Sequence, residues 1–276
     1  MAGNMAKLSI TTAWNEAVEI LKRDFGALFT IALALMALPS VLLQALGPGR
    51  VGPGEVPGPG YWMLAIPVVL LLSIAGSIAI ASLALGRERV VGSAIAHGFR
   101  RFLPMLGAVL ILLVPTIIVI VALVQMAGLQ PQALLNPTPA TVGKMALVFL
   151  LFFVVALYFG TRLMLMTPVA AAETAGPVDI IRRSWALTRG HFWKLLGFVL
   201  LLAVAAIVIM IVVNIVIGLL IAAIAGLPEP GSLAALLILL LGGLVNAAFS
   251  AVFGTIVARV YVQLAGDAES TGRVFE

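Results

Sequence analysis

The chain contains no cysteine and only two histidines among its 276 residues. The absence of cysteine excludes a disulfide framework, a thiolate nucleophile and a cysteine-based metal site. His97 and His191 each stand beside arginines, with no second ligand at the spacing that a zinc site requires. We therefore predict neither a metal site nor a bound cofactor.

Sequence motifs that carry catalysis are missing as well. The chain has no phosphate-binding loop of the Walker type, no GxSxG nucleophile motif and no pair of carboxylates within an apolar run. These absences predict that the chain is not an enzyme.

Charge is scarce throughout the chain. Asp, Glu, Lys and Arg make up 10% of the residues, against about a quarter in soluble globular domains. Hydrophobic residues make up 63%, and the mean hydropathy is +1.21, so we predict an all-α, polytopic transmembrane helical bundle. The net charge of +5 would suit nucleic acid, but the basic residues are scattered between apolar runs. That placement favours an anionic membrane surface as partner, and no nucleic acid.

Apolar runs long enough to cross a hydrocarbon core of ~30 Å recur along the chain. We predict six spans, at residues 26–46, 61–85, 102–126, 145–167, 195–225 and 232–264. Asn214 would be the place for a break in the fifth span, but a break there would leave an odd number of crossings. Residues 47–60 hold ten glycines and prolines in 14 positions and predict a loop, as do the prolines of residues 129–143. Small residues recur at helical spacing in the last span and indicate close helix packing: Gly243, Ala247 and Ala251.

Three amphipathic segments precede the first, third and fifth spans, at residues 11–24, 86–101 and 177–194. We predict that each is a cytoplasmic helix lying at the membrane interface. The side of the membrane that carries these segments also carries 14 of the 16 Lys and Arg residues, leaving only Arg50 and Lys144 on the other side. The positive-inside rule therefore predicts that both termini are cytoplasmic.

The amphipathic segments align with one another on a phenylalanine, and each alignment places an apolar residue seven positions earlier. The aligned pairs are Val18 with Phe25, Ile95 with Phe102, and Trp185 with Phe192. This spacing predicts a threefold internal repeat of one surface helix and two spans, at residues 9–85, 86–167 and 168–265. The alternative is that any interfacial helix shows this pattern. In either case we predict a single membrane domain over residues 1–276, with a short polar tail at 266–276.

Residues 177–197 concentrate the basic charge of the chain, and they include the stretch RRSWALTRGHFWKLLG. Together with the preceding Arg162, Glu173 and Gly176, this stretch resembles the membrane domain of some glycerophosphoryl diester phosphodiesterases and related stand-alone bacterial inner-membrane proteins of unknown function. The resemblance covers about residues 162–197, and it implies six spans in a bacterial cytoplasmic (inner) membrane. In that family the phosphodiesterase activity belongs to a separate soluble barrel of about 250 residues. A 276-residue chain with six spans leaves no room for it, so the resemblance does not imply the activity here.

Arg162 and Glu173 are candidates for a structural ion pair across the turn at Pro168, because an unpaired guanidinium inside a span is costly. The alternative is that Arg162 extends to the cytoplasmic interface. We predict that eight basic residues contact lipid head groups: Arg182, Arg183, Arg189, Lys194, Arg100, Arg101, Lys22 and Arg23. The alternative for these residues is that they only orient the protein during insertion. We predict four interfacial anchors: Trp14, Trp185, Phe192 and Trp193.

These patterns favour a non-enzymatic integral inner-membrane protein, a scaffold or accessory component of the bacterial envelope that interacts with lipid. Its expected partners are anionic lipid head groups and other membrane proteins. The alternative is a small-molecule or lipid transporter, although the spans lack acidic residues that would couple ions. An enzyme acting on lipid head groups is a third class, and it would need the catalytic residues that are missing.

Overall fold

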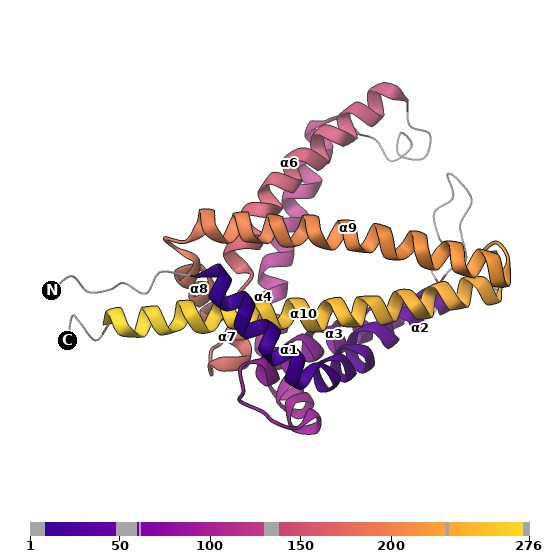
Figure 1. The fold of residues 1–276 in the computed structure, drawn as a ribbon. Helices are drawn as coiled ribbons and strands as arrows, with labels where there is room; N and C mark the ends of the chain where they lie inside the picture. The colour runs from indigo at the N-terminus through magenta and orange to yellow at the C-terminus, as the bar shows by residue number, and fades with distance from the viewer. Residues whose placement is uncertain (1–8, 48–59, 61, 130–137, 230–231, 273–276) are drawn as a thin grey trace.

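The computed structural model describes residues 9–47, 60, 62–129, 138–229 and 232–272. Within these residues all regular secondary structure is helical, so the predicted all-α fold is confirmed (Figure 1). The helices are α1 (Ile10–Ala32), the π-helix η1 (Leu33–Ala37), α2 (Leu38–Leu46), α3 (Trp62–Ala84), α4 (Val91–Met126), α6 (Pro139–Leu163), α7 (Met166–Ala172), α8 (Pro177–Thr188), α9 (Phe192–Ala225) and α10 (Leu233–Gly272).

Six helical stretches in the described residues are long and apolar enough to cross a membrane, which confirms a multi-pass helical bundle. They are Ile10–Ala45, Trp62–Ala84, Val91–Met126, Pro139–Ala172, Phe192–Ala225 and Leu233–Gly266. The tail predicted at 266–276 is in part helical, because α10 continues to Gly272.

The spans form three successive pairs: α1 to α2 with α3, α4 with α6, and α9 with α10 (Figure 1). The pairs pack together at the end of the bundle where α7 and α8 lie, and the α4–α6 pair points away from the α9–α10 pair. We call the shared end the packed end. Its buried core draws residues from seven helices, and it includes the fully buried Val169 of α7, Ile180 of α8 and Leu195 of α9.

Beyond the packed end, α4, α6 and α9 expose mostly large apolar side chains. In α4 the four buried residues all precede Val109: Ala94, Gly98, Met105 and Ala108. In α9 most side chains between Leu200 and Leu220 are exposed. In a membrane such surfaces face lipid acyl chains, so the exposed apolar area is consistent with the six spans.

Two of the three predicted surface helices are not separate elements. Residues 11–24 belong to α1, and residues 91–101 belong to α4, which continues without a break into its span. Only residues 177–188 form a helix of their own, α8. There the chain turns at Gly190, whose φ of +98° suits glycine. The switch from amphipathic to fully apolar sequence leaves the backbone hydrogen bonds intact, so it does not by itself end a helix.

The spans also differ from the prediction at their ends. Helix α6 begins at Pro139, inside the predicted 129–143 loop, because Thr138 caps it by accepting a hydrogen bond from the Thr141 N–H at 3.2 Å. It ends at Leu163, and α7 then carries Pro168 in its first turn, where proline is tolerated. Helix α9 does not break at Asn214, whose side chain donates to the Met210 carbonyl at 2.7 Å.

The π-helix η1 interrupts the first span and ends at Ala37, two residues before Pro39. Proline lacks an N–H, and its ring clashes with the carbonyl of the residue four positions earlier in an α-helix. A single wider turn relieves that clash while the helix continues.

Candidate functional site

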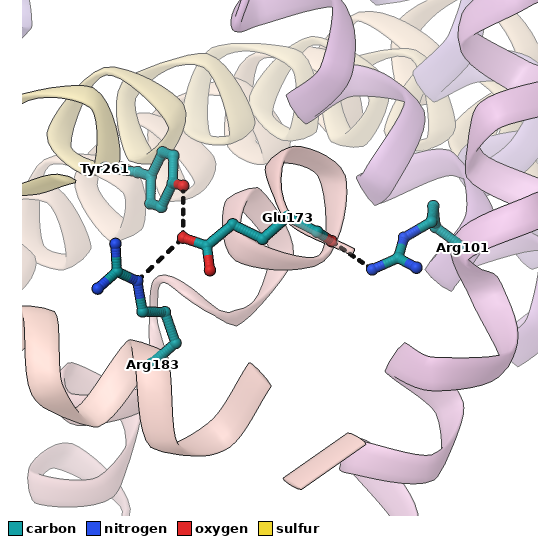
Figure 2. Close-up of polar contacts among 4 residues, drawn as sticks. All are labelled: Arg101, Glu173, Arg183 and Tyr261. Atoms are coloured by element: carbon teal, nitrogen blue, oxygen red, sulfur yellow. Dashed lines mark hydrogen bonds and ion pairs between the residues drawn. The ribbon is translucent and has the colours of Figure 1, made fainter. Parts of the chain in front are cut away.

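Glu173 is the centre of a polar cluster at the packed end. It is the C-terminal cap of α7 and has extended backbone geometry. Its Oε1 accepts hydrogen bonds from Nε of Arg183 at 3.0 Å and from the hydroxyl of Tyr261 at 2.8 Å (Figure 2). Tyr261 is only 7% exposed, and the Glu173 side chain is 29% exposed. The carboxylate therefore joins α8 and α10 to the end of α7 in a partly desolvated environment.

Helix α4 contacts the same turn from the opposite side, where its side chains bond to backbone carbonyls of the turn. Arg101 donates from Nη2 to the carbonyl of Glu173 (Figure 2). It also donates from Nε to the Ala170 carbonyl at 3.1 Å and from Nη2 to the Ala175 carbonyl at 3.2 Å. One turn earlier, Nε2 of His97 lies 3.0 Å from the Ala171 carbonyl. The last carbonyls of a helix lack partners within it, and positive charge is favourable there. Arg101 and His97 thus complete the C-terminus of α7.

The predicted ion pair between Arg162 and Glu173 is wrong. Glu173 pairs with Arg183 instead. The prediction assumed a tight turn at Pro168, but α7 continues from there to Ala172, which at 1.5 Å per residue carries Glu173 about 7.5 Å beyond Pro168 along the helix. Arg162 lies in the last turn of α6, and its carbonyl accepts hydrogen bonds from Ser184 at 3.0 Å and Thr188 at 3.2 Å.

The guanidinium of Arg162 lies among three aromatic rings. Its Cζ is 5.7 Å from the ring centroid of Tyr158, 5.3 Å from that of Trp185 and 4.9 Å from that of Phe192. Aromatic faces attract cations at these distances. The rings come from α6, α8 and α9, so Arg162 marks the junction of these three helices.

A second ion pair joins the first and last spans. Nε of Arg259 on α10 lies 2.8 Å from Oε2 of Glu16 on α1. Near it, the backbone N–H of Ser9 donates to Oε1 of Gln263 at 3.2 Å. These bonds hold the start of α1 against the end of α10. The sequence signal for the ion pair is opposite charge near the same end of two apolar runs.

The residues predicted to contact lipid fall into two groups. Arg101 and Arg183 are partly buried and bind other parts of the protein, as described above. The other six are exposed, and we call them the exposed basic residues: Lys22, Arg23, Arg100, Arg182, Arg189 and Lys194. Arg23 also pairs with Asp24 at 2.8 Å. Among the predicted anchors, Trp14 and Trp193 are exposed, while Trp185 and Phe192 are partly buried around Arg162.

Comparison with known proteins identifies a family for the chain. A family model described as "Domain of unknown function (DUF7847)" matches residues 8–264. The chain belongs to this family. No curated protein and no solved structure matches the chain. The resemblance of residues 162–197 to the glycerophosphoryl diester phosphodiesterase membrane domain therefore stays a prediction.

Cavities in this DUF7847 chain lie between the spans. One of about 240 Å³ opens between α4 and α6, and its walls include Leu112, Phe152 and Phe159. Another, of about 180 Å³, lies between η1, α3, α7 and α10 beside Ser77 and Phe253. Both are lined mainly by apolar side chains, which suits hydrocarbon. Among the residues that the structure describes, no three His, Asp or Glu side chains gather as a metal site would require.

Proposed function

We propose that this chain is a non-enzymatic multi-pass protein of a bacterial inner membrane, and that it binds anionic lipid head groups at its packed end. The observation that carries the proposal is the position of the exposed basic residues. Arg100, Arg182, Arg189 and Lys194 stand in or directly after α4, α8 and α9, within two residues of side chains in the buried core of the packed end, whereas Lys22 and Arg23 lie further along α1. Basic side chains near an anionic leaflet each gain about 1 kcal/mol.

The distribution of charge along the spans supports the orientation in this proposal. Lys144 lies at the far end of the bundle, beside Gly128 at the end of α4. In the predicted topology, 14 of the 16 Lys and Arg residues fall on the side of the spans opposite to Lys144. By the positive-inside rule, the packed end would therefore face the cytoplasm. The resemblance of residues 162–197 to stand-alone inner-membrane proteins supports the choice of membrane and a role without catalysis.

The proposal is tested by lipid selectivity. Arg100, Arg182, Arg189 and Lys194 would be changed together to Gln, and the purified chain would be offered equal amounts of phosphatidylglycerol and phosphatidylcholine. Native mass spectrometry would count the lipids that remain bound. We expect the parent chain to retain the anionic lipid preferentially and the fourfold variant to lose most of that preference, because its four substitutions remove positive charge from the surface that would attract it.

Lys144→Gln at the opposite end is the matched control, and it should leave the selectivity unchanged. A fourfold variant that inserts normally and keeps the parent ratio of the two lipids would contradict the proposal. The basic residues would then serve only to orient the chain.

A further inference from the structure

Polar groups at the junction of α6, α8 and α9 have no hydrogen-bond partner among the residues that the structure describes. Nε and Nη1 of Arg162 and Nδ1 of His191 are buried, and none of them is paired with any described residue. The aromatic rings around Arg162 stabilise its positive charge through their faces. They supply no acceptors for the in-plane N–H groups of the guanidinium, however, and a buried donor without an acceptor is costly.

Thr188 links the backbones of Arg162 and His191. The hydroxyl of Thr188 donates to the Arg162 carbonyl at 3.2 Å, and the Thr188 carbonyl accepts from the His191 N–H at 3.3 Å. Phe192, the next residue, lies over the guanidinium at 4.9 Å. Both residues as a whole are partly exposed, but the three unpaired atoms are themselves buried, so a ligand would reach them only after the side chains that cover them move aside.

An apolar groove continues from this junction along α6. The cavity of about 240 Å³ between α4 and α6 is walled by Phe159 and Leu163, which flank Arg162 in sequence. The Phe159 ring lies 5.9 Å from the ring of Trp185, which also faces the guanidinium. Phe159 therefore forms a wall common to the aromatic cluster and to the groove. A charged group and a hydrocarbon slot are thus side by side.

We propose that a membrane phospholipid binds here, with its phosphodiester at Arg162 and His191 and one acyl chain in the groove between α4 and α6. The planar guanidinium donates paired hydrogen bonds that match phosphate oxygens. An apolar slot open to the bilayer selects a lipid over a free anion. The inference rests on the proposed function in taking lipid as the partner, but this site recognises the phosphate group, whereas the exposed basic residues recognise net negative charge.

Phosphatidylcholine is the probe that separates the two sites, because it has a phosphodiester and no net charge. The full chain, delipidated in detergent, would be titrated with phosphatidylcholine and with diacylglycerol, and one-lipid adducts would be measured by native mass spectrometry. We expect a saturable phosphatidylcholine adduct and none with diacylglycerol. Arg162→Gln should weaken the adduct about tenfold, the effect of losing a charged hydrogen bond.

A second variant tests the groove without altering the guanidinium. Ala156 lines the groove, so Ala156→Phe should fill it and weaken the phosphatidylcholine adduct to a similar extent. This variant decides the question if Arg162→Gln does not fold. The fourfold variant of the exposed basic residues should keep the phosphatidylcholine adduct. A failure of the proposed function and a failure of this site can therefore be told apart.

Two outcomes would overturn the site. One is a phosphatidylcholine adduct of parent affinity in Ala156→Phe and in any folded Arg162→Gln. The other is thermal stabilisation by inorganic phosphate that depends on Arg162, with no phospholipid adduct, which would assign the turn to a free anion.

Discussion

Glu173 concentrates several contacts in one side chain and its own carbonyl. The carboxylate takes hydrogen bonds from Arg183 and Tyr261, and the carbonyl takes one from Arg101. Removing one partner of a partly buried charge leaves the other unpaired, which costs more than the pair itself contributes. The packed end should therefore respond to changes at these residues as a unit.

The first residue-scale prediction is that Glu173 is energetically coupled to Arg183 and not to Arg162. Glu173→Gln and Arg183→Gln should each lower the thermal stability of the purified protein, and the double variant should lose less than the sum. For residues in direct contact we expect a coupling of roughly 0.5–3 kcal/mol. The cycle of Glu173→Gln with Arg162→Gln is the control, and it should be additive. Additive losses in the Arg183 cycle would show that the ion pair does not form.

Sequence reasoning reached some of these residues and not their partners. It singled out Arg162 and Glu173 because charges near apolar runs are rare, and both do lie at the packed end. The partners are set by how far α7 carries the chain and by which helix faces which, and neither is encoded in the spacing of two residues. Tyr261 was missed because a tyrosine near the end of a helix has no distinctive pattern.

At the scale of elements, the contact of α3 with α4 depends on one glycine. A Cβ atom built on Gly98 would overlap the carbonyl oxygen of Ala75. Close approach of backbones at small residues is the usual way in which membrane helices pack. The small residues for which we predicted close packing in the last span also lie at a helix contact. Gly243, Ala247 and Ala251 are all buried, and a Cβ on Gly243 would lie 2.7 Å from Val41.

We predict that Gly98→Ala destabilises the protein by about 1–3 kcal/mol, the usual cost of overpacking. The added methyl group meets backbone, which cannot rotate away. Gly92→Ala in the same helix is the matched control, since nothing lies within 4 Å of its Cβ position; it should be neutral or stabilise by up to about 1 kcal/mol. Thermal unfolding in detergent measures both. Equal stability of the two variants would show that α3 and α4 do not touch at Gly98.

The three helix pairs are the elements that the sequence best predicted, because apolar runs of about 20 residues are dictated by the thickness of the bilayer. The predicted repeats at 9–85, 86–167 and 168–265 each contain one pair. Where each helix begins was less predictable. A change in polarity marks the membrane surface, whereas a helix ends only where the backbone is forced to turn, as at Gly190.

At the scale of the whole molecule, the ends of the spans sort into two sides. Ser9 and Gln263, near the two ends of the described chain, are joined by a hydrogen bond of 3.2 Å, so α1 begins where α10 leaves the bundle. An even number of crossings requires this arrangement, and the six spans provide it. The distribution of positive charge then predicts which side faces the cytoplasm.

The last prediction concerns that orientation. The natural chain has no cysteine, so single cysteines can be introduced at exposed positions on each side and labelled in intact cells with a membrane-impermeant maleimide. Ala140 and Glu229 are exposed at the far end, and Gly92 and Thr174 are exposed at the packed end. We expect Ala140→Cys and Glu229→Cys to be labelled from outside, and Gly92→Cys and Thr174→Cys only after the membrane is made permeable. The reverse pattern would place the basic, packed end outside the cell, where the cytoplasmic anionic leaflet cannot be its partner.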